Sequence, residues 1–279
     1  MTCIDAHQHF WHPARGDYGW MPADNEILCR PYSPADLDGA RKSVGVEQTI
    51  LVQAAPSVHE TEYMLGIADS NPHIGKVVGW VDFNDPSQID TLKRLAGHPK
   101  FSGVRPMIQD LPDDNWMHLP EVQWAYQAIV DLDLTFDCLG FVRHAEGFHT
   151  LLTRYPKMRA VIDHCLKPQL RDHSDEAFHE WAAGISKLAE DTNAFCKLSG
   201  LLTEADEDWS NGVIKPYTDH VISAFGAQRV MWGSDWPVLR LRTEYENWLE
   251  QAKQLTAHLS EEDRQWVFNR SARAFYQLT

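Results

Sequence analysis

Short segments rich in β-branched and aromatic residues alternate along this chain with longer stretches whose apolar residues recur at helical spacing. Strict alternation of strands and helices is typical of a parallel sheet, and eight strands are the number that closes a barrel. We therefore predict an α/β fold, a (β/α)8 TIM barrel. The eight predicted strands are residues 3–7, 48–54, 76–83, 101–107, 134–139, 158–164, 194–198 and 229–232.

The stretches between the predicted strands carry helix signals. Ser174 is placed to cap a helix in which Trp181 and Ile185 share an apolar face. Ser260, with an aspartate three residues later, predicts the start of another helix. The chain has no Ser/Gly-rich linker, low-complexity stretch or internal repeat, so we predict a single domain over residues 1–279.

Four residues that can act as acid, base or metal ligand lie where predicted strands end. His7 and His9 flank one residue at the end of the first strand, and alternate strand residues point to the same face. His164 ends the sixth predicted strand and Asp235 follows the eighth. The C-terminal ends of all strands in a barrel meet at one mouth. We therefore predict that these four residues form one active site, although they are far apart in sequence.

Two chemistries fit this set of side chains. In the first, His7, His9 and Asp235 hold a single Zn²⁺ ion through nitrogen and oxygen donors. In the second, no cofactor is required: Asp235 takes a proton from water while the imidazoles polarise a carbonyl oxygen. Both predict hydrolysis of an ester-like or amide-like bond, and the residues by themselves leave the two open.

Substrate contacts are predicted from residues beside the strand ends. Arg105 follows the fourth strand core and Gln53 lies near the end of the second. Residues 12–34 form an irregular segment rich in proline and aromatic side chains, including Trp20, and we expect it to cover the pocket. Trp236, after the last strand, is a further candidate contact, although tryptophans in such places more often serve packing.

Charge and composition limit the kinds of molecule that this protein is expected to bind. The chain has 25 Lys and Arg against 40 Asp and Glu, a formal net charge of −15, with no basic run that could neutralise phosphates. We therefore expect a small-molecule substrate and no nucleic acid or membrane partner. No leader pattern and no stretch of roughly 18 apolar residues occurs, which predicts a cytoplasmic protein. Five scattered cysteines without a Cys-X-X-Cys pair indicate buried thiols. Assembly into a homo-oligomer stays open.

Six short motifs then occur in order along the chain. They are IDAHQHFW (residues 4–11), GWVD (79–82), GVRP (103–106), DH with KP (163–168), KLSGL (197–201) and GSDWPV (233–238). Together they resemble the sugar-lactonase branch of the amidohydrolase superfamily, in particular bacterial hydrolases of the L-fuconolactonase and L-rhamnonolactonase type. The resemblance runs from residue 3 to about 277. It implies a distorted barrel, with Asp235 as general base and the three histidines around the reacting carbonyl.

The strand ends depart from the pattern of the metal-dependent members of that superfamily. Those members usually have a histidine at the end of the fifth strand and often a bridging lysine or carboxylate at the fourth. Here the fifth strand ends in Asp137, Cys138 and Leu139, and the fourth ends in Arg105. A two-metal centre is therefore not expected, and a zinc ion is optional because a lactone carbonyl needs less Lewis-acid help than an amide.

The resemblance predicts an enzyme that opens a sugar lactone, such as an L-fucono- or L-rhamnonolactone, to the aldonic acid. The first alternative is a hydrolase or decarboxylase of a pyrone, muconolactone or other carboxylated ring. Such substrates call for several arginines at the mouth, where only loop residues could join Arg105: Arg30, Arg143, Arg240 or Arg242. The second alternative is a non-catalytic sugar-binding barrel, which would have no reason to keep the three histidines and Asp235 together.

Overall fold

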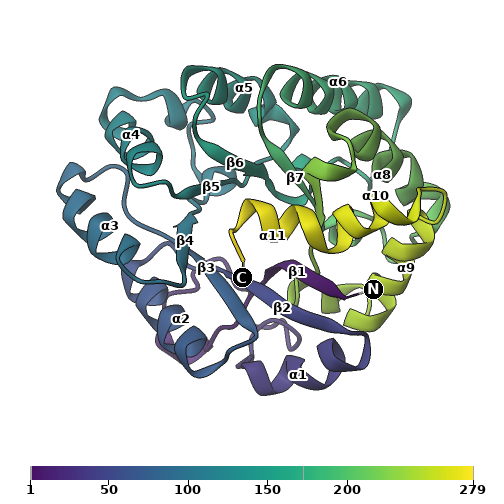
Figure 1. The fold of residues 1–279 in the computed structure, drawn as a ribbon, viewed down its shortest axis with the longest axis horizontal. Helices are drawn as coiled ribbons and strands as arrows, with labels where there is room; N and C mark the ends of the chain where they lie inside the picture. Colours follow the sequence, from purple (N-terminus) through teal and green to yellow (C-terminus); the bar gives the residue numbers. More distant parts are fainter. Residues whose placement is uncertain (1, 172, 279) are drawn as a thin grey trace.

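Eight parallel strands form one sheet in strand order β1 to β8 in the computed structural model, which describes residues 2–171 and 173–278. The strands lie in the middle of the molecule and the helices surround them (Figure 1). Every predicted strand is present, and the predicted barrel is confirmed. Most predictions ran past the C-terminal end, because the residues there already belong to the loops. The strands are β1 (Cys3–Gln8), β2 (Val46–Val52), β3 (Ile74–Gly79), β4 (Phe101–Val104), β5 (Thr135–Cys138), β6 (Arg159–Ile162), β7 (Phe195–Leu198) and β8 (Val230–Trp232).

The helices follow the strands along the chain and begin where the sequence signals predict. The Ser174 side chain accepts a hydrogen bond from the backbone N–H of Ala177 at 3.1 Å, and Ser260 accepts one from Asp263 at 3.1 Å. The helices are α1 (Pro34–Ser43), α2 (Val58–Ser70), α3 (Ile89–Ala96), α4 (Gln123–Asp131), α5 (Ala145–Arg154), α6 (Asp175–Asp191), α7 (Leu201–Glu204), α8 (Asn211–Phe225), α9 (Tyr245–Leu255), α10 (Glu261–Gln265) and α11 (Ser271–Phe275). Among the described residues, no helix combines the length and the hydropathy that crossing a bilayer requires.

The end of the barrel where the strands begin is covered by the last part of the chain. Helices α10 and α11 cross this end of the ring (Figure 1). From α11 and the residue after it, Phe275 and Tyr276 pack in one buried cluster with Ile4, Ala6 and apolar residues of β2, β3, β6 and β8. This end is therefore filled by side chains, which leaves the opposite end for a ligand.

The first and last strands meet at the opposite end of the barrel. Gln8 forms a parallel bridge with Trp236. The backbone N–H of His9 donates to the carbonyl of Trp236 at 2.7 Å, and that of Asp235 donates to the carbonyl of His7 at 2.8 Å. These bonds nearly close the barrel, and they hold three of the four predicted site residues directly against one another.

Candidate active site

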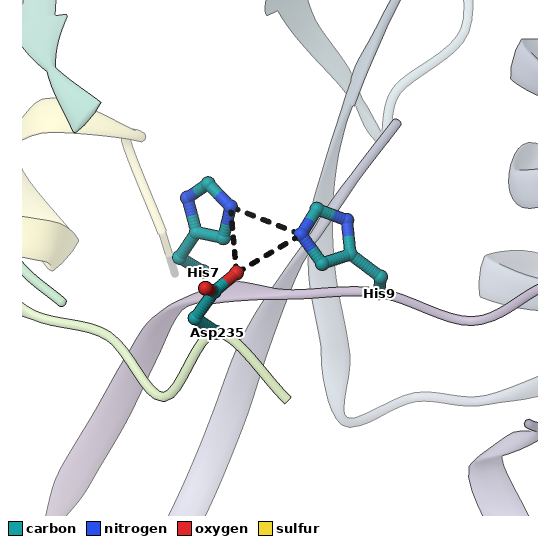
Figure 2. Close-up of side chains that lie close together, drawn as sticks. All are labelled: His7, His9 and Asp235. Carbon is teal, nitrogen blue, oxygen red and sulfur yellow. Dashed lines mark hydrogen bonds and ion pairs between the residues drawn. The ribbon is translucent and has the colours of Figure 1, made fainter. Parts of the chain in front are cut away.

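The polar atoms of His7, His9 and Asp235 converge at the mouth of the barrel (Figure 2). The Nε2 atoms of the two histidines are 3.1 Å apart, and Asp235 Oδ1 is 3.3 Å from His9 Nε2 and 3.7 Å from His7 Nε2. His164 Nε2 lies 3.9 Å from the same Oδ1 atom. All four residues are buried. We call these four residues the histidine cluster.

A bulge in β1 aims the two histidines into the barrel. The β1–β2 register shifts between Asp5 and Gln8, so that one strand carries an extra residue there. Ile4 and Ala6 pack in the buried cluster inside the barrel. His7, although adjacent to Ala6, also points inward and contacts Lys197. Strict alternation would have sent Ala6 and His7 to opposite faces, so the bulge re-aims the side chain, as bulges near active sites often do.

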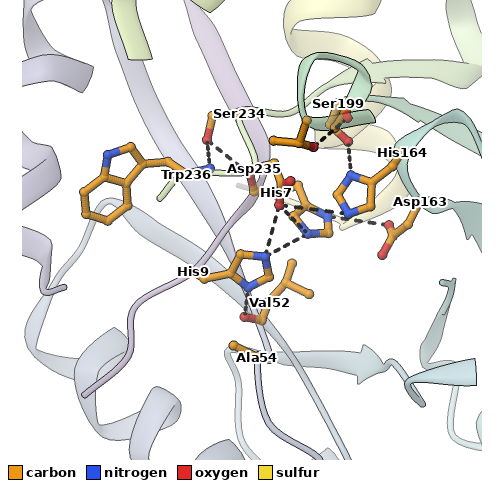
Figure 3. A network of polar contacts seen from close by, with 12 residues as sticks. His7, His9, Val52, Ala54, Asp163, His164, Ser199, Ser234, Asp235 and Trp236 are labelled. Carbon is orange, nitrogen blue, oxygen red and sulfur yellow. Dashed lines mark hydrogen bonds and ion pairs between the residues drawn. The ribbon is translucent and has the colours of Figure 1, made fainter. Parts of the chain in front are cut away.

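Two segments of the site are held in left-handed backbone conformations. His164, Cys165, Leu166 and Lys167 follow one another with φ of 53°, 52°, 61° and 45°, and Asp235 has φ of 58°. Residues other than glycine rarely adopt such angles, which cost of the order of 1–3 kcal/mol each and cluster at functional sites. The turn points the His164 ring across the mouth toward Asp235 (Figure 3).

Gly200 makes room for that ring. Its φ is 68°, and a Cβ at this position would come within 2.6 Å of His164 Nδ1. A glycine is therefore required here both for backbone conformation and for space.

A hydrogen bond fixes the proton position on His9. His9 Nδ1 lies 2.7 Å from the carbonyl oxygen of Val52, which can only accept, so Nδ1 carries the proton and Nε2 presents its lone pair. His7 has a cationic donor at each ring nitrogen, Lys197 at 3.1 Å from Nδ1 and Arg105 at 3.2 Å from Nε2, and the two donors favour opposite tautomers. Burial lowers the pKa of both imidazoles, so both rings are neutral.

The proton position on His164 depends on a different kind of partner. Its Nδ1 is 2.9 Å from Ser199 Oγ, a hydroxyl that can donate or accept, so Nε2 is free to carry the proton. Burial lowers the pKa of His164 to about 4 despite the nearby carboxylates of Asp235 and Asp163. Burial alone would oppose ionisation of Asp235, but His164, His9 and His7 outweigh it and hold its pKa well below the ordinary range. The site at neutral pH thus pairs an ionised carboxylate with neutral imidazoles.

A second charged group lies directly beneath the histidine cluster. The Lys197 ammonium contacts Asp137 Oδ2 at 2.5 Å and Asp163 Oδ1 at 2.9 Å, and none of the three side chains is exposed. We call these three residues the lysine cluster. Burial would lower the pKa of Lys197, but the two carboxylates outweigh burial and raise it. With its contact to His7, the ammonium therefore has three acceptors for its three hydrogens.

The three acceptor atoms of His7, His9 and Asp235 lie within 4.8 Å of one another, as a metal site requires. The lone pair of His9 Nε2 faces the Asp235 carboxylate, an arrangement that a cation between them would satisfy. A cation bound to His7 Nε2 requires the His7 proton on Nδ1, where Asp163 Oδ1 at 3.5 Å can accept it. The donor set therefore fits one divalent ion of the zinc type. The Lys197 ammonium opposes a proton on Nδ1, because it lies 3.1 Å from that atom.

The mouth of the barrel encloses a cavity of about 320 Å³, which we call the reaction cavity. Predicted residues His9, His164, Asp235, Arg105 and Trp20 line it. Trp20 belongs to the irregular segment after β1, which does cover the pocket as predicted. Residues that sequence reasoning did not single out also line the cavity, among them Trp11, Met107, Gln109, Asp110, Leu139 and Lys167.

Two predicted substrate contacts do not line the reaction cavity. The Gln53 amide donates to the carbonyl of Arg105 at 2.6 Å, so it fixes the Arg105 backbone from behind. The Trp236 ring packs edge-on against Phe10 and Tyr32, with centroids 5.8 and 5.0 Å away. Both residues serve packing here, and the geometry lends no support to direct contact with a substrate.

Arg105 supplies positive charge between the two clusters. Its Nη1 atom is 3.2 Å from both His7 Nε2 and Asp163 Oδ2, and its Nη2 atom donates to the carbonyl of Gln53. The side chain is 4% exposed and borders the reaction cavity. None of the four loop arginines that could have joined it lines this cavity: Arg30, Arg143, Arg240 and Arg242.

Sequence reasoning missed the buried partners that hold these groups. Lys197 stood in a quoted motif without a role, and a lysine inside an apolar strand was the available signal. Asp5 gave a similar signal in β1: its carboxylate accepts from the backbone N–H of Ser234 at 2.8 Å, from its hydroxyl at 2.6 Å, and from the Tyr245 hydroxyl at 3.0 Å. Asp5 thereby ties β1 to the loop that carries Asp235.

Comparison with known proteins places this geometry in a family. The L-fucono-1,5-lactonase of Burkholderia ambifaria is 39% identical over 279 residues, covering 99% of this chain and 95% of that protein. The L-fucono-1,5-lactonase of Burkholderia multivorans is 33% identical, covering 99% and 96%. A crystal structure of a Burkholderia multivorans amidohydrolase with bound zinc superposes with a TM-score of 0.94 at 31% identity, covering all of both chains.

The family model described as Amidohydrolase matches residues 4–278, nearly the whole chain. Its match includes β1 from Ile4 onward, the whole of β2 to β8, and every residue of the histidine and lysine clusters. The chain therefore belongs to the amidohydrolase family.

Proposed function

We propose that this protein is a lactonase that hydrolyses the ring ester of a sugar lactone, such as L-fucono-1,5-lactone, to the aldonic acid. The observation that carries the proposal is Asp235: one ionised carboxylate set among neutral imidazoles at the edge of a cavity with room for a single small ring. The two Burkholderia relatives named for this activity, 39% and 33% identical over nearly their full length, support it.

Asp235 acts as the general base. Water bound beside Oδ1 attacks the lactone carbonyl carbon while its proton passes to the carboxylate. The low pKa of Asp235 keeps it ionised and ready in the resting enzyme. When the bond between the carbonyl carbon and the ring oxygen breaks, the proton is returned to the leaving alkoxide, and the open acid is released.

His164 and Arg105 stabilise the oxyanion that forms on the carbonyl oxygen. The Ser199 hydroxyl can donate to His164 Nδ1, which leaves the Nε2–H directed toward the reaction cavity as a hydrogen-bond donor. The Arg105 guanidinium adds a fixed positive charge at the cavity wall. His7 and His9 position Asp235 through the backbone bonds that join β1 to the loop carrying Asp235.

His7, His9 and Asp235 would hold a single divalent ion, such as Zn²⁺, if the enzyme binds one. When bound, such an ion supplies Lewis-acid polarisation of the carbonyl and lowers the pKa of water. The Lys197 ammonium at 3.1 Å from His7 Nδ1 makes His7 a poorer ligand, which favours weak binding and an optional ion. The side chains of this chain provide a base and oxyanion donors without it.

The charge of the reaction cavity favours a neutral sugar lactone over a carboxylated ring. Of the described residues that line it, Arg105 and Lys167 carry positive charge, and Asp110 and Asp235 carry negative charge. Arg105 is already engaged by Asp163 at 3.2 Å. Lys167 lies 3.9 Å from the Glu204 carboxylate, so it is paired as well. A dicarboxylate would therefore find no unpaired cation among the described residues that line this mouth.

The proposal is tested with a panel of lactones. Aldono-1,4- and 1,5-lactones, a pyrone dicarboxylate and a muconolactone are incubated with purified enzyme, and acid release is followed with a pH indicator after subtraction of spontaneous opening. We expect turnover of one or more aldonolactones and none of the carboxylated rings. Turnover confined to the carboxylated rings would replace the proposal, and no turnover of any lactone would refute it.

A further inference from the structure

A second cavity, of about 420 Å³, adjoins the reaction cavity on the same face of the barrel. Trp20, Met107 and Asp110 line both cavities, so the two hollows meet along these three side chains. The second cavity extends over the loops that follow β3 and β4. Each volume is near the lower end of the ~300–1,000 Å³ typical of small-molecule sites, which suits one small ring apiece.

Aromatic rings with fixed orientations form one wall of the second cavity. The Trp116 indole N–H donates to Asn84 Oδ1 at 2.9 Å, and the Phe83 ring stacks on it with centroids 5.8 Å apart. The Trp20 indole N–H donates to the carbonyl of Ala54 at 2.6 Å. With Trp80, these rings give the second cavity broad apolar surfaces that are already in place before a ligand arrives.

Carboxylates supply most of the charge in the second cavity. Asp17 is neutralised by Arg15 at 2.7 Å, whereas Asp82 and Asp110 have no cation at ion-pair distance among the described residues. The described residues that line the cavity include no Lys, Arg or His. The cavity therefore repels carboxylate and phosphate groups, unlike the reaction cavity beside it.

Aromatic faces combined with carboxylate acceptors suit a neutral sugar ring. The C–H face of such a ring packs on an indole, and its hydroxyls donate to Asp82 and Asp110, which can only accept. A purely apolar ligand would desolvate those carboxylates and leave them only their present hydrogen bonds, from Asn84 to Asp82 and from Gln109 to Asp110. We propose that the second cavity binds a neutral sugar ring, which is the second ring of a two-ring aldonolactone whose lactone ring lies beside Asp235.

The part of this inference that concerns the two-ring lactone as substrate rests on the proposed lactonase function. The part that concerns binding of a sugar ring depends only on the second cavity. The kinetic test compares D-glucono-1,5-lactone with cellobiono-1,5-lactone, which is the same lactone carrying a further glucose ring. We expect the enzyme to favour the two-ring lactone in kcat/KM by about tenfold or more, equivalent to about 1.4 kcal/mol. The Trp80→Ala and Asp82→Asn variants are expected to reduce this ratio, Trp80→Ala by about tenfold and Asp82→Asn by a few-fold.

Two matched controls lie outside both cavities. Trp266→Ala removes a partly buried indole and Asp90→Asn removes an exposed carboxylate, and both are expected to retain the wild-type ratio. Equal kcat/KM for the two lactones in the wild type would overturn the proposal. A ratio unchanged by Trp80→Ala and Asp82→Asn would do the same, because the preference would then arise elsewhere.

A binding test separates this inference from the proposed function. Tryptophan fluorescence is titrated with methyl β-D-glucopyranoside, choline chloride and sodium benzoate in the wild type and all four variants. We expect saturable glucoside binding that Trp80→Ala and Asp82→Asn weaken, with no binding of benzoate. Choline binding without glucoside binding would identify a cation site and refute the sugar site. Glucoside binding without any lactone turnover would refute only the proposed function.

Discussion

The histidine cluster and the lysine cluster lie one above the other in the same barrel, yet their charges are arranged in opposite ways. In the lysine cluster, the Lys197 ammonium is surrounded by Asp137, Asp163 and His7 and is closed off from solvent. In the histidine cluster, Asp235 faces neutral imidazoles and borders the reaction cavity. The lysine cluster thus balances its buried charges internally, whereas the histidine cluster leaves a carboxylate without a cationic partner at the edge of the reaction cavity.

The largest expected effect comes from removing the unneutralised charge. Asp235→Asn keeps the shape of the side chain but removes the base, so we expect kcat to fall by about 10²- to 10⁴-fold. Because no cation is left without its partner, the urea midpoint should stay near that of the wild type. Activity assays and unfolding curves on the same preparation measure both effects. Normal turnover in a folded Asp235→Asn protein would rule out this residue as the base.

The second prediction concerns removal of the ammonium group from the lysine cluster. Lys197→Met leaves Asp137 and Asp163 buried without their ammonium partner, so we expect a loss of about 3–5 kcal/mol in the free energy of unfolding. The double variant Lys197→Met/Asp137→Asn should recover part of this loss. The control is Lys215→Met, whose exposed pair with Asp219 should contribute less than about 1 kcal/mol. Equal effects of the buried and exposed lysines would show that the lower cluster has no special role in stability.

The pH dependence of kcat/KM tests the charge states assigned to the histidine cluster. Burial lowers the pKa of His164 to about 4, so its neutral, donating form persists down to that pH. Asp235 stays ionised over the same range because its pKa is lower still. We expect kcat/KM to be flat from about pH 5 to 7 and to fall about tenfold per unit below pH 4. Rates measured immediately after a pH jump avoid unfolding, and an acid limb centred near pH 6.5 would contradict this assignment.

The smallest effect is expected from metal removal. His7 already has polar neighbours at both ring nitrogens, Lys197 at Nδ1 and Arg105 and His9 at Nε2, so the histidine cluster is held in place without an ion. After treatment with a chelator, with metal content checked by elemental analysis, we expect the lactonase rate to fall by less than about tenfold. A metal-free preparation that is inactive and regains full activity with Zn²⁺ would make the ion essential.

The sequence was sufficient for the parts of the molecule that follow regular periodicity. Alternating strands and helices predicted the barrel, and barrel geometry then brought His7, His9, His164 and Asp235 together without any knowledge of their distances. The helix caps at Ser174 and Ser260 followed from local hydrogen bonding and were also predicted. Each of these features depends on the chain close by or on the fold as a whole.

Features that depend on particular tertiary contacts were out of reach. The bulge in β1 breaks the alternation between Ala6 and His7, which the sequence pattern does not indicate, although His7 and His9 converge as predicted. The left-handed turn that begins at His164 contains no glycine, the residue that would have predicted such a conformation from the sequence. Trp236 was a candidate substrate contact for which packing was the commoner role, and its ring packs on Tyr32 through a tertiary contact that the sequence does not indicate.

The seam between β1 and β8 has a consequence for the time course of folding. His9 and Asp235 are brought together by backbone bonds between residues more than two hundred positions apart, so the site forms only when the barrel closes. Contacts of such long range carry a large loop-closure entropy and form late. A partly folded chain should therefore hold well-formed helices and strands while remaining catalytically silent, and the return of activity during refolding should mark the moment of closure.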